Sequence, residues 1–544
     1  MAPVQKNMIQ KTMTQANNTM IDPHNSNHRL IGFDVTDHGK RRYGQQKRQI
    51  KGGQWGRVFS VSLLMALAGC ASTVDENKVE RGQLGFISGF YGGVAVDEPR
   101  AALVGRNILS QGGKAADAAA AIYFALTVTM PSRASLASGG VCLTYEGRTQ
   151  KSETLDFRLQ QTTPVAGGAG QAVPVPAAPL AFYLLHSKYG RRLPWASLVI
   201  PAENLARFGN QVSRAFAKDV KAAKPLIDGS PALQQLLKNG AGNIVGEGDY
   251  LRQLDLSAQL ATIRAKTSGD MYHGVGGRKF MEAVRLGGGK INENALRNYK
   301  PNWRDVKKVG YVLGTQFIFP DAGDVSNTGA DKIINALAEP KNYAALPENA
   351  RDQRFLEIQK KVMPKLRQIN GEGDKSVTSF LVVDRVGNAV ACNLSMNKLF
   401  GSGVVARGTG IIMGAVPDGN GDGPLMNAMM LVSIIRPTFI YASTGGGGLD
   451  SAAAMTRVAL DVFADEDDKL TLETIVNKGR VFSNPSSGAV IAEQNVKSNS
   501  AAQTVPVIGR LNAMYCSTGI PNEKGEQCTV YTDPRGFGLA VSNR

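Results

Sequence analysis

Two short motifs in the chain carry groups that can bind or stabilise negative charge. The segment TLDFRLQ places Arg158 at the end of a strand-like run, where a guanidinium fork can hold a carboxylate through two hydrogen bonds. The segment TGGGG places Gly445 and Gly446 between an apolar strand-like run and a helical one, so their backbone N–H groups can converge on a developing negative charge. The alternatives are a surface ion pair for Arg158 and a turn with positive φ for the glycines.

Histidine is scarce, and this limits the mechanisms open to a hydrolase. Of the five histidines, only His186 and His273 lie beyond the first 69 residues. His186 falls in an amphipathic helical stretch, where it is expected to be a surface or satisfied residue, and His273 falls in a turn-rich loop. Neither a Ser-His-Asp triad nor a His-rich metal site is easily built from them. We therefore expect a base other than histidine, with no metal and no cofactor.

Residues 58–68, VFSVSLLMALA, follow a basic flank and precede Gly69-Cys70. This pattern indicates a secretory signal, and the apolar run is too short to span a bilayer permanently. The motif LAGC resembles a bacterial lipobox, in which the Cys70 thiol takes a lipid and becomes the new N-terminus. The alternative is a core helix that ends in Gly-Cys.

The leader defines the first part of the domain organisation. We expect residues 1–69 to be a signal or leader segment with the lipobox, and residues 70–85 to be a tether. The protein would then be a lipoprotein of the cell envelope that faces the periplasm. By resemblance to other lipoproteins, Ala71 favours the outer membrane.

The basic balance of the chain does not indicate nucleic acid binding. The net charge is +17, and residues 1–69 hold ten Lys or Arg against three Asp. No Lys/Arg block interleaved with aromatic residues follows residue 70. With 43% hydrophobic and 20% charged residues, the remainder has the composition of an ordinary globular protein.

Four cysteines follow the lipobox. Cys142 and Cys392 lie in apolar strand-like runs and are expected to be small buried hydrophobic residues. Cys516 and Cys528 flank a turn-rich loop between two strand-like runs, so a disulfide there is plausible in an oxidising compartment. Their spacing does not match a zinc site.

The order of helical and strand-like segments predicts an α+β fold. Helical patterns cover residues 97–130, with a break at Gly112-Gly113, and much of residues 178–300. A strand pair lies between them, and a polar helical stretch follows at residues 340–376, ending in a flexible-looking loop. Strands then dominate, with one later helix after TGGGG. Grouped strands with long helices favour a sandwich over a doubly wound sheet.

Several segments, in one order, resemble the γ-glutamyltransferase family of N-terminal-nucleophile hydrolases over roughly residues 88–540. They include ILSQGGKAADAAAA, TLDFR, the long stretch that begins VPVPAAPLAFYLLHSKYG, GDMYHGVGGRKFMEAVRLGGG, VTSFLVVDRVGNAVACNLSMNKLFGSGVV, TGGGG and TDPRG. Each motif alone is weak, and their collinear order is the signal.

The resemblance implies a four-layer αββα sandwich made as one chain that cuts itself before a threonine. It divides the chain into a large-subunit-like region, 86–377, and a small-subunit-like region, 378–544, which carries the nucleophile strand. The freed α-amino group has an unperturbed pKa of about 8, so it can serve as the base for its own hydroxyl. The loop at 366–376 is the expected scissile segment.

Thr378 is our candidate nucleophile. The family pattern is Thr-Thr-His-aromatic-Ser-Val-Val-Asp, and a gap-free overlay that ends on Asp384 puts Val377 at the position of the nucleophile. Thr378 serves only if the strand absorbs a shift of one residue, because such a shift otherwise moves a side chain to the opposite face. An ordinary strand threonine is the alternative, and Ser376 is a more distant candidate.

The resemblance also assigns roles to other residues. Ser395 matches the family's second hydroxyl residue, which can relay a proton or fix the nucleophile's rotamer, and Asn397 matches an asparagine that contacts substrate. Gly445 and Gly446 match the oxyanion glycines, and Arg158 matches the arginine that holds the substrate α-carboxylate. The alternative for Ser395 and Asn397 is a strand end near a turn.

Two departures concern the amino end of the substrate. Asn427 and Ala428 stand where the family has paired serines. The family's acidic residue for the substrate amino group falls near residues 416–419, where only Asp418 is available, one place off. Another amide with a nearby carboxylate is therefore an open alternative to a γ-glutamyl substrate.

Taken together, these features predict an autoprocessed threonine amidohydrolase or acyl transferase, similar to γ-glutamyltransferase or glutathione hydrolase. Its expected partner is a small γ-glutamyl or carboxylate-bearing amide. Two alternatives remain: a catalytically silent binding lipoprotein on the same fold, and an acylase with a different acyl group.

Overall fold

The computed structural model describes most of the chain after residue 91, within the compact unit Glu76–Arg544. The described residues are 92–160, 170–311, 314–322, 329–337, 343, 345–370, 376–417, 424–464, 470–496, 501–522 and 528–542. The predicted leader and tether, Cys70 and Asp418 lie outside them. None of the helices in these ranges is long and apolar enough to cross a membrane.

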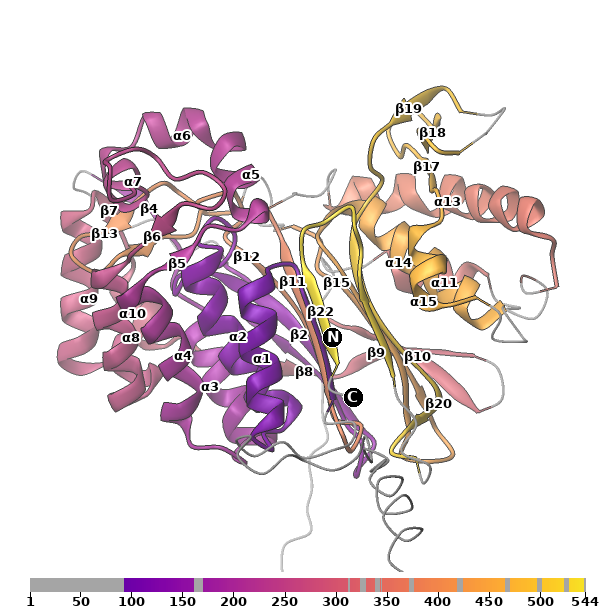
Figure 1. Cartoon of the computed structure of the whole chain (residues 1–544), viewed down its shortest axis with the longest axis horizontal. Coiled ribbons are helices and arrows are strands. Elements are labelled where there is room, and N and C mark those ends of the chain that lie inside the picture. The colour runs from indigo at the N-terminus through magenta and orange to yellow at the C-terminus, as the bar shows by residue number, and fades with distance from the viewer. Residues whose placement is uncertain are drawn as a thin grey trace, which may run out of the picture. The chain divides into compact units, whose positions relative to one another are not determined.

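Two antiparallel sheets face each other at the centre of this unit (Figure 1). The first sheet has the order β22 (Leu539–Ser542), β1 (Gly92–Val96), β11 (Thr378–Asp384), β12 (Ala389–Ser395), β2 (Gly139–Glu146), β3 (Lys151–Asp156) and β8 (Asn302–Arg304). The second has the order β21 (Thr529–Thr532), β20 (Leu511–Ile520), β16 (Phe439–Gly445), β15 (Asn427–Ser433), β10 (Thr315–Pro320) and β9 (Val306–Gly310).

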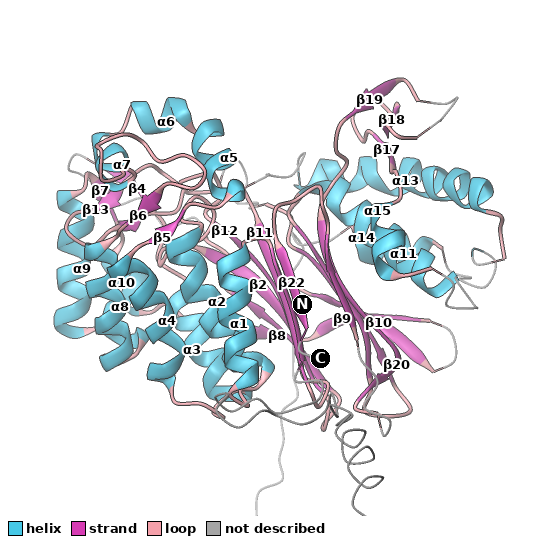
Figure 2. Cartoon of the chain, in the orientation of Figure 1, coloured by secondary structure: helices cyan, strands magenta, loops and turns pink. Residues whose placement is uncertain are grey.

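Helices cover the outer face of each sheet (Figure 2). Against the first sheet lie α1 (Pro99–Ser110), α2 (Ala115–Thr129) and α3 (Ala178–Tyr189), and α4 (Trp195–Phe208) packs on α2. The helices farther along the chain are α5 (Arg214–Ala222), α6 (Lys224–Asp228), α7 (Pro231–Leu236), α8 (Leu254–Lys266), α9 (Gly274–Leu286) and α10 (Glu293–Arg297). Against the second sheet lie α11 (Ala330–Ala336), α14 (Gly448–Ala464) and α15 (Leu472–Asn477), and α13 (Glu348–Asn370) packs on α11 and α14. This is the predicted four-layer αββα sandwich.

Short elements complete the fold. A small sheet is formed by β17 (Val481–Ser483), β18 (Val490–Glu493) and β19 (Gln503–Val505). Two-stranded pairs join β4 (Gln171–Ala172) with β7 (Gly289–Lys290), β5 (Asn210–Gln211) with β6 (Tyr250–Leu251), and β13 (Val405–Ala406) with β14 (Ile411–Ile412), and a 3₁₀ turn covers Ser268–Met271.

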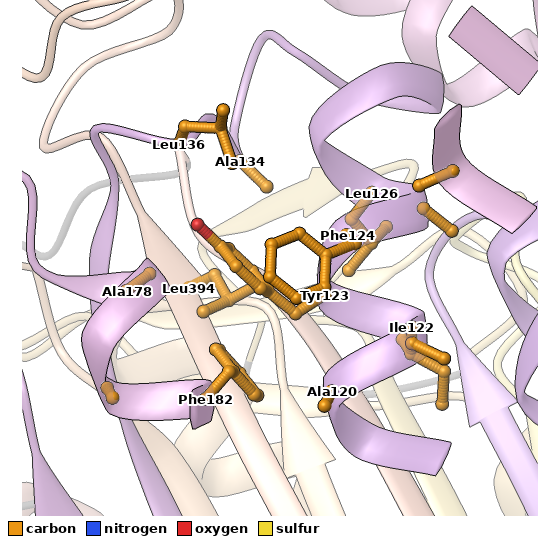
Figure 3. Packing of buried hydrophobic residues seen from close by; sticks show 14 of the residues in the cluster. Ala120, Ile122, Tyr123, Phe124, Leu126, Ala134, Leu136, Ala178, Phe182 and Leu394 are labelled. Carbon is orange, nitrogen blue, oxygen red and sulfur yellow. The ribbon is translucent and has the colours of Figure 1, made fainter. Parts of the chain in front are cut away.

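The core beneath the first sheet is built around α2, in which every residue is buried. Its alanines let the helix approach the neighbouring elements closely, and Tyr123 stacks on Phe182 of α3 with ring centroids 4.3 Å apart. Figure 3 shows these rings together with Leu394 of β12. Because β11 and β12 pack on this rigid layer, the first residues of β11 are held firmly in place.

The structure corrects two expectations about local features. Cys142 and Cys392 are not free: they face each other on β2 and β12 and form a disulfide. The second pair, Cys516 and Cys528, is also joined, as its spacing suggested. The first part of the expected loop at 366–376 is helical, because α13 continues to Asn370, and residues 371–375 lie outside the described residues. Pairing across a sheet depends on strand order, which the periodicity of each strand does not encode.

Candidate active site

The strand β11 has regular register from its first residue to its last. It pairs with β1 from Val96↔Phe380 to Gly92↔Asp384, and with β12 from Thr378↔Leu394 onward, with no bulge. Phe380 therefore faces the helices of the first layer, and its neighbour Leu381 faces the second sheet.

Thr378 shares the face of Phe380. Its side chain is fully buried, and its Oγ1 lies 3.5 Å from Asp97 Oδ2 and 3.7 Å from the sulfur of Met130. The shift of one residue that would turn Thr378 toward the space between the sheets is therefore absent from β11. Asp97 is held at this point because β1 ends at Val96 and α1 begins at Pro99, two residues after it.

Val377 occupies the space between the sheets that the overlay assigned to the nucleophile. Its side chain packs with Val141, Ala322 and Met426 in a small apolar cluster. Its carbonyl oxygen accepts two hydrogen bonds, one from Arg133 Nη1 at 2.8 Å and one from Arg510 Nη2 at 2.7 Å. The peptide bond before Thr378 is thus held at its oxygen by two guanidinium groups.

Each of these arginines has a carboxylate neighbour. Arg133 donates from Nε and Nη2 to the two oxygens of Asp219, both at 2.6 Å, and both side chains are buried. Arg510 Nε lies 3.8 Å from Asp97 Oδ2. Burial, with the nearby Arg133 charge, lowers the pKa of Arg510, while Asp97 and Asp219 act in the opposite direction.

Ser395 lies beside Ser376, the residue before Val377. Its Oγ is 3.1 Å from the Oγ of Ser376, and it accepts the N–H of Asn397 at 2.9 Å. Asn397 in turn donates from Nδ2 to the Ala415 carbonyl at 2.9 Å. Asn397 has φ +65°, which its short polar side chain tolerates.

The two predicted glycines lie at the end of β16. Gly446 donates its N–H to the Arg510 carbonyl at 3.3 Å, and the Gly445 carbonyl accepts from Asn393 Nδ2 at 2.8 Å. A Cβ on Gly446 would lie 2.3 Å from Arg510 Nε, so only glycine leaves room for this guanidinium. An oxyanion role for Gly446 would require its N–H to leave the Arg510 carbonyl.

Arg158 lies two residues beyond the end of β3. It donates from Nε and Nη2 to the two oxygens of Asp156, both at 3.0 Å, and from Nη2 to the Ala322 carbonyl. Asp156 is buried, so this pair is not a surface ion pair. Through Ala322, Arg158 adjoins the apolar cluster around Val377. Within the described residues, Arg158 Nη1 has no hydrogen-bond partner.

Asn427 and Ala428, which stand in place of the paired serines, begin β15. Asn427 is fully buried and donates from Nδ2 to the Gly448 carbonyl at 2.8 Å. In the part of the chain that the structure describes, its Oδ1 has no partner. Ala428 packs between the sheets.

Sequence reasoning missed Asp97, Arg133 and Arg510. All three interact with the backbone or with one another around residues 377–379, and a sequence pattern does not identify a backbone acceptor. A signal existed for Arg133, because it is a charged residue inside the otherwise uncharged segment MPSRASLASGG. His186, by contrast, bears out the expectation of a satisfied residue, since its Nδ1 lies 2.8 Å from Asp117.

Comparisons with known proteins agree with this architecture. The family model for gamma-glutamyltranspeptidase matches residues 101–320 and 308–416, together more than half of the chain. Glutathione hydrolase proenzyme of Bacillus subtilis is 26% identical over 73% of this chain and 81% of its own length. Glutathione hydrolase 3 of Arabidopsis thaliana is 24% identical over 68% and 70%.

A solved structure shows the same fold. Cephalosporin acylase from Bacillus halodurans superposes with a TM-score of 0.64 over 85% of this chain and 97% of its own, at 21% identity.

Proposed function

Because the chain belongs to the gamma-glutamyltranspeptidase family, it is a γ-glutamyltransferase-like amidohydrolase or acyl transferase, and we propose that it works through Thr378 after cleaving its own chain between Val377 and Thr378. The observation that carries the proposal is the convergence at residues 376–377. Ser395 contacts Ser376, Gly446 contacts the arginine that holds the Val377 carbonyl, and Arg158 adjoins the cluster around the Val377 side chain.

Cleavage would supply an amine base next to the Thr378 hydroxyl. Before it, the nitrogen of Thr378 is an amide and cannot accept a proton. Afterwards it is an α-amino group whose unperturbed pKa is about 8, close enough to neutrality to deprotonate the neighbouring hydroxyl. No histidine is required.

Cleavage would also make room for a substrate. Once Val377 is a chain end, its side chain is free to leave the space beside Val141, Ala322 and Met426. Arg158 lies next to that space, and its Nη1, which has no partner among the described residues, could hold a substrate carboxylate. This fits a small γ-glutamyl amide such as the substrate that the name of the glutathione hydrolases implies. It also fits another amide with a nearby carboxylate.

The test is to identify the new N-terminus. The purified protein, run reduced and denatured, is expected to contain a fragment of 167 residues that begins at Thr378. Thr378→Ala should leave the chain whole and abolish hydrolysis of a γ-glutamyl anilide. A fragment that begins at Ser376 would transfer the role to that serine, and an uncut wild-type chain would refute the proposal.

A second candidate is a binding protein without catalysis. It is favoured by the regular register of β11, which turns the Thr378 hydroxyl toward Met130 and the helical layer. It predicts that γ-glutamyl compounds bind, with loss of binding in Arg158→Met, but are not turned over whether or not the chain is cut.

We also propose that the protein is an envelope lipoprotein, lipidated at Cys70 and facing the periplasm, in the outer membrane. The LAGC motif and the following Ala71 support this, and two disulfides suit an oxidising compartment. Radiolabelled palmitate should enter the wild-type protein and not Cys70→Ala, and the variant should appear in the soluble periplasmic fraction. Equal labelling of both would refute the anchor.

A further inference from the structure

We infer that Arg133 and Arg510 form the oxyanion site for the self-cleavage, with Asp97 as the acceptor of the Thr378 proton. This rests on the proposed function, because it explains how that cleavage would occur. Both arginines donate to the oxygen of the one carbonyl that Thr378 would attack, at 2.8 and 2.7 Å. A carbonyl held in this way is polarised before the reaction begins.

The charges of Arg133 and Arg510 suit the negative charge that would develop on the Val377 oxygen during cleavage. Two guanidinium groups donate to one neutral carbonyl oxygen in a largely buried site. A negative charge that develops on the Val377 oxygen would be attracted to them more strongly there than in water. Asp219 neutralises Arg133 from the far side, which holds that guanidinium in place through two hydrogen bonds. These donors therefore favour the tetrahedral intermediate over the ground state.

Asp97 is placed to take the proton. Its Oδ2 lies 3.5 Å from Thr378 Oγ1, and it also accepts the Ser379 N–H at 2.8 Å. Its Oδ1 accepts from Asn512 Nδ2 at 2.9 Å. The carboxylate is thus fixed beside the hydroxyl, on the face toward which the regular strand turns Thr378.

The chemical step is an N-to-O acyl shift followed by hydrolysis. Thr378 Oγ1 attacks the carbonyl carbon of Val377 as its proton passes to Asp97, and the carbonyl oxygen becomes the oxyanion. The C–N bond then breaks, and the Thr378 nitrogen takes the proton back from Asp97. The resulting ester is hydrolysed by water, which leaves a carboxyl group on Val377 and restores the hydroxyl of Thr378 next to a free amine.

Gly446 enters this reaction as a positioning residue. Its missing side chain makes the space that Arg510 Nε occupies, and its N–H donates to the Arg510 carbonyl. Gly446→Ala would displace the guanidinium from the Val377 oxygen without changing any charge. The variant therefore separates the position of Arg510 from its charge.

The experiment follows cleavage of the whole chain made by oxidising cell-free synthesis, sampled over time on reducing gels. Arg510→Ala, Gly446→Ala and Arg133→Lys are each expected to slow cleavage about 10²- to 10³-fold, the usual cost of one lost oxyanion donor. Lysine at 133 keeps a charge beside Asp219. Asp97→Asn should stop cleavage. Arg457→Ala is the control, because Arg457 also pairs with a buried aspartate, Asp461, within helix α14.

Chemical rescue separates a direct role from a structural one. Millimolar guanidinium ion should accelerate cleavage of Arg510→Ala and leave Thr378→Ala uncut. If Arg510→Ala and Gly446→Ala cleave at the wild-type rate, the inference is wrong while the proposed function stands. If the wild-type chain never cleaves, the proposed function fails as well. If Arg510→Ala cleaves slowly and has the wild-type melting temperature, but guanidinium ion does not accelerate its cleavage, Arg510 has a structural role only. That result would overturn its role at the Val377 carbonyl oxygen.

Discussion

At the scale of single residues, Arg158 shows how a binding group is prepared. Asp156 is buried and takes two of the guanidinium N–H groups, and the Ala322 carbonyl takes another, so the side chain has a fixed direction before any ligand arrives. A preorganised fork loses little conformational entropy on binding. Arg304 also reaches Asp156, at 3.4 Å, but its side chain is 41% exposed.

The expected result for Arg158→Lys is a loss of substrate affinity without a loss of self-cleavage. Lysine keeps the charge but cannot form the fork, so KM for a carboxylate-bearing amide should rise at least about tenfold, as for loss of a charge-assisted hydrogen bond. Arg304→Lys is the matched control, with nearly unchanged KM. Equal KM values for wild type and Arg158→Lys would place the carboxylate elsewhere.

At the scale of elements, the small sheet β17–β19 is tied to the segment that precedes β22 by a buried ion pair. Arg535, in the motif TDPRG, donates from Nε to Glu493 Oε1 at 2.6 Å and also pairs with Asp533 at 3.1 Å. Burial raises the pKa of Glu493, but the bonds from Arg535 and the Ile508 N–H outweigh this and leave it below the usual 4.5. The motif thus has a structural role of its own.

Arg535→Met is expected to reduce the free energy of unfolding by about 3–5 kcal/mol, since it leaves a buried carboxylate unpaired. The exposed pair Arg354–Glu357 supplies a control, and Arg354→Met should cost under about 1 kcal/mol. Urea unfolding followed by tryptophan fluorescence measures both. If the two variants lose similar free energies of unfolding, the buried pair stabilises the fold no more than the exposed pair does.

The same pair predicts a dependence on pH. The folded pKa of Glu493 is lowered, so its stabilisation is fully present above the unfolded value of 4.5 and is lost as the pH falls through the folded value. The difference in stability between wild type and Glu493→Gln should therefore be constant from pH 7 to about 5 and shrink below 4.5. A difference that grows on acidification would have the wrong sign.

The sequence predicted the elements better than it predicted their contacts. The break at Gly112-Gly113 lies between α1 and α2, and the strand–glycine–helix order of TGGGG appears as β16 followed by α14. These features depend on residues close in the chain. The disulfide between β2 and β12 joins residues that are 250 positions apart in the sequence. Arg133 and Arg510, which both bind the Val377 carbonyl oxygen, are 377 positions apart. Only the strand order of the folded sheets brings such groups together.

At the scale of the whole molecule, the predicted boundary at 377/378 does not divide the fold. β11 and β12 follow that boundary, yet they lie in one sheet between β1 and β2, which precede it. The segments on either side are therefore complementary parts of one core. Residues 86–377 alone would leave β1 and β2 without the strands between them and would uncover the apolar surface of α2. We therefore expect neither segment to fold when expressed by itself, as judged by near-UV circular dichroism.

The bridge between Cys142 and Cys392 has a consequence for the maturation of this protein. One cysteine lies before the Val377–Thr378 bond and the other lies after it, so a nicked chain remains a single covalent molecule. Without reductant, nicked and intact protein should migrate together. The double variant Cys142→Ser, Cys392→Ser should release the 167-residue fragment on a non-reducing gel. The double variant Cys516→Ser, Cys528→Ser should not, because the disulfide that it removes has both cysteines within that fragment.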